Sequence, residues 1–210
     1  MTRLLLLPAL LLATAQTAVP TPLPAPNPAP TPAPAADTVD VTITTTAGPI
    51  VVALDRGHAP ISTANFLRYV DGKRFDGIAF YRSMKLPWNA GLIQAGQRDG
   101  KKIFPPIRHE PTTTTGLSHV EGTISMARRE PGSAQGEWTI MVGDMTGLDA
   151  KPGPNPPADP GYAAFGKVVS GMDVVKTIWA APTDPQKGEG AMKGQLLTAP
   201  VRILTIRRTP

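Results

Sequence analysis

The sequence contains no cysteine and few aromatic residues or histidines. Without cysteine among its 210 residues, it can form no disulfide, no zinc–thiolate centre and no thiol nucleophile. The three histidines, His58, His109 and His119, form no i, i+4 pair of the metalloprotease type, and we interpret them as surface or loop residues. A Gly-x-Ser-x-Gly nucleophile elbow is also missing. The sequence therefore predicts no metal site, no cofactor and no serine-hydrolase chemistry.

Charge of one sign is not concentrated anywhere in the sequence. Lys and Arg number 21 against 16 Asp and Glu, which gives a formal net charge of +5. The basic residues occur as scattered pairs, without the basic helix or aromatic-interleaved run of a nucleic-acid-binding surface. We therefore expect a cationic surface and no nucleic-acid partner.

The first 15 residues have the composition of an export signal. Arg3 supplies a positive end, residues 4–13 are mainly apolar, and Ala13-Thr14-Ala15 provides small residues for cleavage before Gln16. The apolar run is shorter than the roughly 20 residues that span a membrane. Residues 1–15 are therefore predicted to be a signal peptide that is removed on export to the periplasm, with no stable membrane insertion afterwards. An uncleaved anchor is the alternative.

Residues 16–36 are predicted to be a linker rich in Pro, Ala and Thr. Proline occupies every second position from Pro20 to Pro34. Because proline fixes φ and lacks an N–H donor, this segment cannot join a helix or a sheet interior, and we expect a semi-rigid polyproline spacer. The spacer would hold a folded domain over residues 37–210 away from a membrane. A proline-rich ligand for another protein is the alternative.

Residues 37–210 have the pattern of one mainly β domain. A domain of this size buries a single core. Apolar and polar residues alternate over 39–54, which predicts a hairpin. Further strands are expected at 79–83, 92–95, 122–127, 138–142, 165–169 and 201–207, and helices at 59–70 and 172–179. Many short strands with only two helices predict an antiparallel barrel.

Two apolar segments each carry a polar side chain that a core disfavours. Arg82 shares one face of an expected strand with Ile78 and Phe80, and Gln94 shares a face with Leu92. Buried polar groups are costly unless they are hydrogen-bonded, so such residues tend to be paired or functional. Arg82 and Gln94 are therefore candidate functional residues. The alternatives are a surface arginine on an edge strand and a buried amide that closes the barrel.

These segments resemble the signature of the cyclophilins, in which Phe-His-Arg is followed by Phe-Met-x-Gln-Gly-Gly. The sequence has Phe80-Tyr81-Arg82 and then Gly-Leu-Ile-Gln-Ala-Gly at 91–96. Three further pieces match in the same order, at 122–127, 161–168 and 171–175. The resemblance spans the chain from about residue 39 to its end. It implies a closed eight-stranded antiparallel barrel capped by two α-helices.

The resemblance also implies peptidyl-prolyl cis-trans isomerase activity on X–Pro bonds of exported proteins. Rotation about an amide breaks no covalent bond and needs no nucleophile, and its barrier of about 18–20 kcal/mol comes from amide resonance. By the family's pattern, Arg82 donates to the amide nitrogen as it becomes pyramidal, and Gln94 orients Arg82 and the substrate backbone. We assign substrate binding to Trp88, Leu92, Met126, Ala127, Arg128, Glu137, Thr139, Leu148 and Tyr162.

The segment between Arg82 and Gln94 is several residues longer than is usual in the family and is expected to form a loop. Its Trp88 is predicted to fold back over a groove formed by Arg82, Gln94, Met126 and Leu148, where the indole would restore apolar area. An exposed loop tryptophan is the alternative.

Two functions of different classes remain open. The first is a monomeric, exported isomerase that acts on proline-containing polypeptides. The second is a cyclophilin-fold chaperone module that binds proline segments with little turnover. Arg82 and Gln94 favour the enzyme, whereas Gly91 and Thr139 in place of pocket aromatics, and Glu137 in place of a glutamine, favour the binder. We adopt the enzyme as the prediction.

Overall fold

A computed structural model describes residues 37–153 and 159–209 of the chain. The predicted signal peptide and the whole of the predicted linker lie outside the described residues. None of the described helices is long and apolar enough to cross a membrane.

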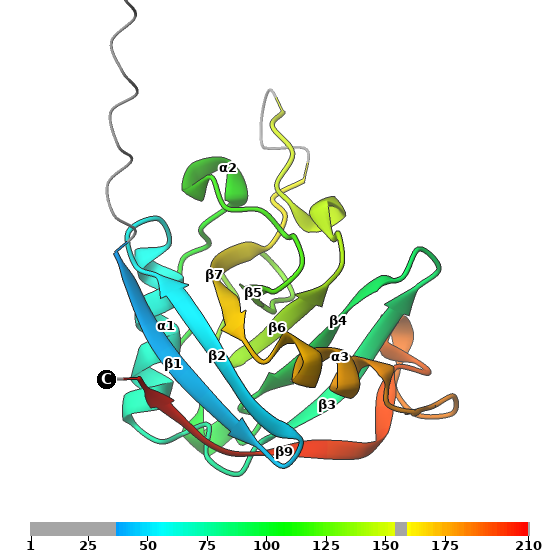
Figure 1. Cartoon of the computed structure of the whole chain (residues 1–210). Coiled ribbons are helices and arrows are strands. Elements are labelled where there is room, and N and C mark those ends of the chain that lie inside the picture. The colour runs from blue at the N-terminus through cyan, green and yellow to red at the C-terminus, as the bar shows by residue number, and fades with distance from the viewer. Residues whose placement is uncertain (1–36, 154–158, 210) are drawn as a thin grey trace, which may run out of the picture. The chain divides into compact units, whose positions relative to one another are not determined.

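The described chain forms one antiparallel sheet that closes into a barrel (Figure 1). Its strands are β1 (Thr38–Thr45), β2 (Gly48–Asp55), β3 (Ala79–Leu86), β4 (Ala90–Gly96), β5 (Thr123–Met126), β6 (Glu137–Val142), β7 (Ala163–Ser170), β8 (Thr183–Asp184) and β9 (Leu196–Arg208). Hydrogen bonds join them in the order β1-β2-β7-β5-β6-β4-β3-β9-β8, and pairing of β1 with β9 closes eight strands, with β8 as an extra strand. The predicted closed eight-stranded barrel is confirmed.

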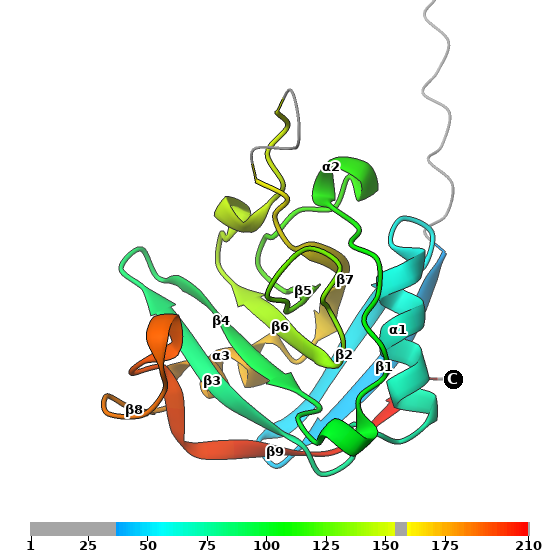
Figure 2. The same cartoon turned by 180° about the vertical axis from the view of Figure 1, so that it is seen from behind.

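Two helices pack against the barrel, as predicted. They are α1 (Pro60–Asp71) and α3 (Met172–Ala180), and each bound lies within one residue of the expected range. Figure 2 shows them beside different parts of the barrel wall. A third helix, α2 (Thr112–Thr115), is a single turn that the sequence did not predict. Proline at the first position of α1 suits a helix start because its missing N–H has no partner there in any case.

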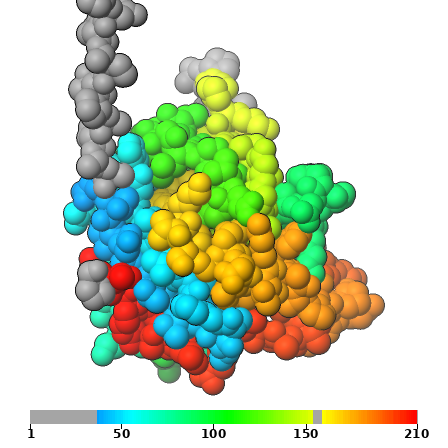
Figure 3. Space-filling view, viewed as in Figure 1, coloured from blue at the N-terminus to red at the C-terminus, as the bar shows by residue number. Residues whose placement is uncertain are grey.

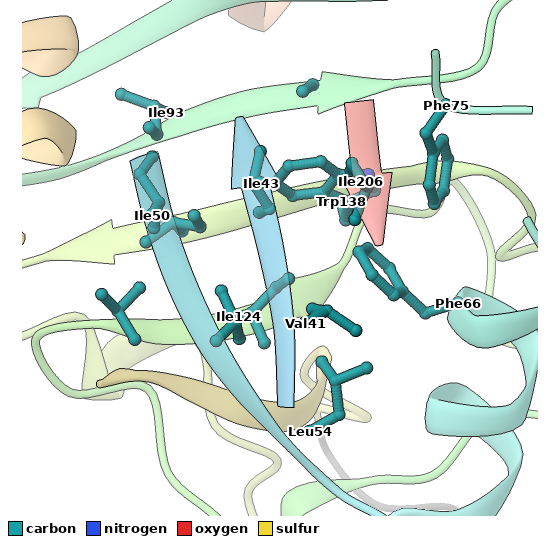
Figure 4. Close-up of a cluster of buried hydrophobic side chains, with 14 of the residues drawn as sticks. Val41, Ile43, Ile50, Leu54, Phe66, Phe75, Ile93, Ile124, Trp138 and Ile206 are labelled. Carbon is teal, nitrogen blue, oxygen red and sulfur yellow. The ribbon is translucent and has the colours of Figure 1, made fainter. Parts of the chain in front are cut away.

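Apolar side chains from alternate strand positions fill the barrel (Figure 4). Val41 and Ile43 on β1 are fully buried beside the aromatic rings of Phe66 and Trp138. The Trp138 ring meets Phe66 edge-on, with ring centroids 5.6 Å apart. The other face of β6 carries Glu137, Thr139 and Met141, because successive side chains of a strand point to opposite faces. Packing of Trp138 and Ile140 in the core therefore holds β6 in place, with the candidate site residues Glu137 and Thr139 on its outer face.

A long hairpin replaces the loop that was predicted after Arg82. β3 runs on to Leu86 and pairs there with Ala90, the first residue of β4, so only a three-residue turn separates the strands. The last residue of that turn, Asn89, has φ of 58°, the left-handed conformation that commonly closes such turns. The prediction of a strand ending at residue 83 and a free loop is wrong, because the extra residues lengthen both strands.

Candidate active site

A β-bulge in β3 brings Tyr81 and Arg82 into one polar network. The pairing of β3 shifts register between Phe80 and Arg82, against both β4 and β9. Phe80 is fully buried with its ring 5.4 Å from that of Trp138, whereas Arg82 bonds to Gln94. Phe80 and Arg82 therefore do not share a face as predicted. An extra residue in one strand interrupts the alternation and re-aims the side chains that follow it.

The pairing of four strands places the candidate residues in one row. Arg82 on β3 pairs with Gln94 on β4, Gln94 pairs with Thr139 on β6, and Thr139 pairs with Ser125 on β5. Directly opposed side chains lie about 4.5–5.5 Å apart at their Cβ atoms. Glu137 lies two residues before Thr139 and shares its face. The barrel wall thus brings together Arg82, Gln94, Glu137 and Thr139, as the sequence predicted.

Two glutamines hold the Arg82 guanidinium. Its Nη1 donates to Oε1 of Gln94 at 2.8 Å, and its Nε and Nη2 both donate to Oε1 of Gln195, at 2.8 and 2.6 Å. Nη2 also lies 3.8 Å from the sulfur of Met84. A guanidinium carries five N–H groups, two of them on Nη1. One N–H on Nη1 is therefore left without a partner among the described residues.

Partial burial of Arg82 changes the pKa of its guanidinium. Desolvation lowers the pKa of Arg82, and the nearby oxygens of Tyr81, Tyr162 and Glu137 act in the opposite direction. The group stays cationic, because an arginine side chain is not deprotonated in proteins. A half-buried cation exerts a stronger field than one in bulk water.

Glu137 anchors the other side of Gln94. The Gln94 amide Nε2 donates to Oε2 of Glu137 at 3.3 Å, and the Tyr81 hydroxyl donates to Oε1 at 3.0 Å. Arg98 lies with Nε 3.6 Å from the same carboxylate, and its guanidinium is 4.7 Å from the centre of the Tyr81 ring. Burial, together with the Glu137 charge, raises the pKa of Tyr81 and keeps its hydroxyl protonated. Both carboxylate oxygens of Glu137 are thus occupied in holding Tyr81 and Gln94.

Arg128 and Tyr162 form a second pair on the same wall. The Arg128 guanidinium lies 4.7 Å from the centre of the Tyr162 ring, and its Nε donates to the carbonyl of Gly161 at 3.1 Å. The Tyr162 backbone N–H donates to the carbonyl of Leu148 at 2.9 Å. Ala127, the residue before Arg128, donates its backbone N–H to the carbonyl of Glu137 at 2.9 Å. Ala127 therefore ties the segment that carries Arg128 to Glu137 on β6, and Arg128 in turn holds the segment of Gly161 and Tyr162.

Met126 does not line the groove as predicted. It is 2% exposed and belongs to the main core, and the Asn65 amide lies 4.0 Å from its sulfur. The alternation of β5 places Ile124 and Met126 inside the barrel and Ser125 on the other face. Thr139 is nearly buried as well, and its hydroxyl donates to the carbonyl of Ser125 at 3.3 Å.

Trp88 lies at the tip of the β3–β4 hairpin and is 66% exposed. It lines a hollow of about 400 Å³ between the hairpin and the segment 144–148. Of the four residues predicted to surround Trp88, Leu148 lines this hollow, whereas Arg82, Gln94 and Met126 do not. Leu92 is buried in the small apolar cluster beneath the hollow, with Ala90, Met141 and Met145.

The backbone of Met84, with Trp179 from α3 beside it, leaves room only for glycine at position 91. A Cβ at Gly91 would clash with the carbonyl oxygen of Met84 and would lie 2.6 Å from Nε1 of Trp179. That indole donates to the Met84 carbonyl at 2.8 Å. The chain therefore has no room at position 91 for the aromatic residue of the family's pattern.

Four contributors to the site were not foreseen: Tyr81, Met84, Arg98 and Gln195. Tyr81 and Met84 flank Arg82, and the bulge that places Tyr81 leaves no sign in residue type. Gln195 is 113 residues from Arg82 in the sequence, in a polar stretch without periodicity. Nothing local marks it as a partner.

His119 lies in a loop, as one of the two expectations had it, but it is fully buried and is not a surface residue. Its Nδ1 lies 2.5 Å from Oδ1 of Asp149, and its Nε2 lies 2.8 Å from the hydroxyl of Ser125. This is the order of contacts in a Ser-His-Asp triad. However, His119 and Ser125 are both completely buried, so a substrate carbonyl cannot approach the hydroxyl. The three side chains join the loop before β5 to the barrel wall.

Comparison with known sequences agrees with these observations. The family model described as cyclophilin type peptidyl-prolyl cis-trans isomerase/CLD matches residues 38–207. A protein of Dickeya dadantii, peptidyl-prolyl cis-trans isomerase A, is 38% identical over 149 residues, which cover 69% of this chain and 73% of that protein. A peptidyl-prolyl cis-trans isomerase of Acinetobacter baylyi is 33% identical over 169 residues, covering 80% of this chain and 84% of the relative.

Solved structures share the fold. The crystal structure of a cyclophilin type peptidyl-prolyl cis-trans isomerase of Cryptosporidium parvum has a TM-score of 0.62 at 19% identity, covering 82% of this chain and 98% of that chain. A structure of the same protein in the presence of the dipeptide Ala-Pro has a TM-score of 0.64 at 19% identity, with coverages of 81% and 99%.

Proposed function

This chain belongs to the cyclophilin-type peptidyl-prolyl cis-trans isomerases and is such an enzyme; we propose that Arg82 is the donor that speeds rotation of the X–Pro bond. The observation that carries this proposal is the guanidinium held by Gln94 and Gln195 with one N–H of Nη1 remaining. Proline-containing polypeptides are the proposed substrates, supported by the related structure obtained in the presence of Ala-Pro.

The chemistry follows from the electronic structure of the amide. As the X–Pro bond twists, resonance is lost, and the nitrogen becomes pyramidal and regains its lone pair. The remaining N–H of Arg82 can donate to that lone pair, which is absent in both planar forms. An interaction that is stronger in the transition state than in the ground state raises the rate of the chemical step. A hydrogen bond to a charged group contributes about 1.5–3 kcal/mol, or roughly tenfold to a hundredfold in rate.

The protein side chains fix the donor before the substrate binds. Gln94 is held in turn by Glu137, and the backbone carbonyl of Gln195 accepts from Ser83 N–H at 2.9 Å. Both supports of Arg82 therefore have anchors of their own. A donor that is already oriented needs no reorganisation when the amide twists.

The experiment that tests this function measures isomerisation of a short peptide with a central Ala-Pro bond. We expect catalysed exchange between the cis and trans forms, which takes tens to hundreds of seconds without catalyst. The second candidate, a binding module with little turnover, is favoured by the lack of room for an aromatic residue at Gly91. Tight binding of the peptide with an unchanged exchange rate would establish that alternative.

The proposed clients are exported proteins, and the proposed location is the periplasm, where the enzyme acts as a monomer. The support is the order of segments in the sequence: a predicted signal over 1–15, a predicted linker over 16–36 and then the isomerase domain. The mature protein is expected to begin near Gln16. Mass spectrometry of the native protein checks this, and an intact Met1 or Thr2 terminus would contradict the export proposal.

A further inference from the structure

The hollow at the end of the hairpin, here called the hairpin hollow, has an apolar lining. Its residues are Met84, Leu86, Trp88, Asp144, Met145, Thr146, Gly147 and Leu148. The volume of about 400 Å³ lies at the low end of the range for small-ligand sites and suits a single large side chain. In Figure 3 the hairpin tip stands off from the yellow-green segment that contains residues 144–148.

Met84 connects Arg82 to the hairpin hollow, because it lines the hollow and contacts the guanidinium. Arg82, Met84 and Leu86 lie at alternate positions beyond the bulge, and the Met84 sulfur is 3.8 Å from Nη2 of Arg82. A strand advances about 3.3 Å per residue, so Leu86 lies roughly 13 Å along the strand from Arg82. An extended substrate has the same rise. If the peptide runs alongside β3 with its proline nitrogen at Arg82, a side chain a few positions along it reaches the hollow.

The chemistry of the lining selects the kind of side chain that fits. Methionine is flexible and polarizable, so Met84 and Met145 can adapt to different apolar shapes. The exposed Trp88 ring offers a large apolar surface at the rim. Asp144 is exposed at the same rim, where its carboxylate accepts the Thr146 N–H at 2.9 Å. Its negative charge disfavours an acidic residue in the substrate.

We propose that the hairpin hollow is a specificity subsite that binds a large apolar side chain, such as Leu or Phe, within about four residues of the substrate proline. This inference rests on the proposed function, because it assumes that the proline binds at Arg82. It assigns a role to the extended end of the β3–β4 hairpin.

The test compares peptides that differ at one position near the proline. In a series with Ala at the flanking positions, Leu is placed at each position in turn, up to four before and four after the proline. We expect Leu to raise kcat/KM and affinity by about tenfold at one of these positions, because burial of such a side chain is favourable. Glu at that position is expected to bind less well than Ala.

A variant with a bulky side chain at the hollow tests whether the hollow causes the preference for Leu. Gly147 lines the hollow, and a Cβ added there meets no heavy atom within 4 Å, so Gly147→Leu adds a bulky side chain at the lining without a clash. We expect this variant to lose the preference for Leu over Ala. Gly100→Leu is the control, since a Cβ there also meets nothing within 4 Å and Gly100 does not line the hollow. Trp88→Ala, at an exposed position, is expected to weaken the preference.

The outcomes separate this inference from the proposed function. Affinity is measured by calorimetric titration beside turnover, so each claim has its own readout. A protein that binds the Leu peptide tenfold more tightly yet turns over no peptide would overturn the isomerase mechanism and support the hollow. Equal affinity and turnover for Leu and Ala at every position, or a Leu preference unchanged in Gly147→Leu, would overturn the subsite.

Discussion

Gln195 accepts two hydrogen bonds from Arg82 through one oxygen, at 2.8 Å from Nε and 2.6 Å from Nη2. The residue lies just before β9, and its backbone carbonyl binds the N–H of Ser83, the neighbour of Arg82. The residue that leads into the last strand of the barrel thus holds Arg82, the proposed catalytic side chain. Gln94 holds the opposite end of the same guanidinium.

Loss of this contact is expected to affect kcat more than KM. In Gln195→Ala, Arg82 keeps Gln94 and the weaker contact of Nη2 with the Met84 sulfur, so the donor is less well oriented when the amide twists. We expect a decrease in kcat of roughly threefold to tenfold with a nearly unchanged KM. Gln195→Glu retains the acceptor oxygen and is expected to recover most of the rate. A rise in KM alone, or equal losses in both variants, would contradict a positioning role.

The Tyr81–Glu137 contact predicts a measurable change in acidity. Burial is the larger cause that raises the pKa of Tyr81, and the Glu137 carboxylate adds to it. In Glu137→Gln the charge is removed while the shape remains, so the pKa of Tyr81 is expected to fall without returning to its usual value. Ultraviolet titration against a Tyr81→Phe reference checks this. An unchanged pKa would show that the Glu137 charge does not act on the hydroxyl.

Buried His119 predicts that stability decreases in weak acid. Burial lowers the pKa of His119, and the contact with Asp149 opposes this only in part. The unfolded chain, with an ordinary histidine pKa of about 6.5, therefore binds the proton more readily than the folded protein. The stability from this group is complete above that pH and is lost as the pH falls toward the folded pKa.

Urea unfolding between pH 7.5 and 5.5 measures this effect. We expect the free energy of unfolding to decline over this interval in the parent protein and to decline less in His119→Asn. Because other groups titrate as well, the difference between the two slopes is the relevant quantity. Parallel curves for the two proteins would contradict the assignment.

Local patterns in the sequence were sufficient for the barrel and its helices. Alternation predicted β1 and β2, and the proline at position 60 together with apolar spacing predicted α1. The partner of the α1 N-terminus was not predictable, since the Glu110 carboxylate that accepts from Ile61 and Ser62 lies almost 50 residues later. Such contacts depend on how distant loops pack.

The resemblance supplied the identity of several candidate site residues. The direction in which their side chains point depends on backbone geometry and was not predicted. Arg82, Gln94 and Glu137 were named because motif positions carry them, and in the structure they lie in one hydrogen-bonded network. The bulge after Phe80 adds one residue to one strand and has no residue-type signal, so the face of Arg82 was assigned incorrectly relative to Phe80. The hairpin tip was predicted to be a loop because the segment is longer than is usual in the family, although only Pro87, Trp88 and Asn89 form the turn.

The most direct test of the mechanism is the isomerisation rate of Arg82→Ala with an Ala-Pro peptide. The variant removes the donor but leaves the fully buried core unchanged, so urea unfolding is expected to show a folded protein. The account predicts a decrease in kcat/KM of more than about tenfold, as expected for loss of one charge-assisted hydrogen bond in the transition state. Turnover by Arg82→Ala at the parental rate would contradict the assignment of Arg82 as the donor.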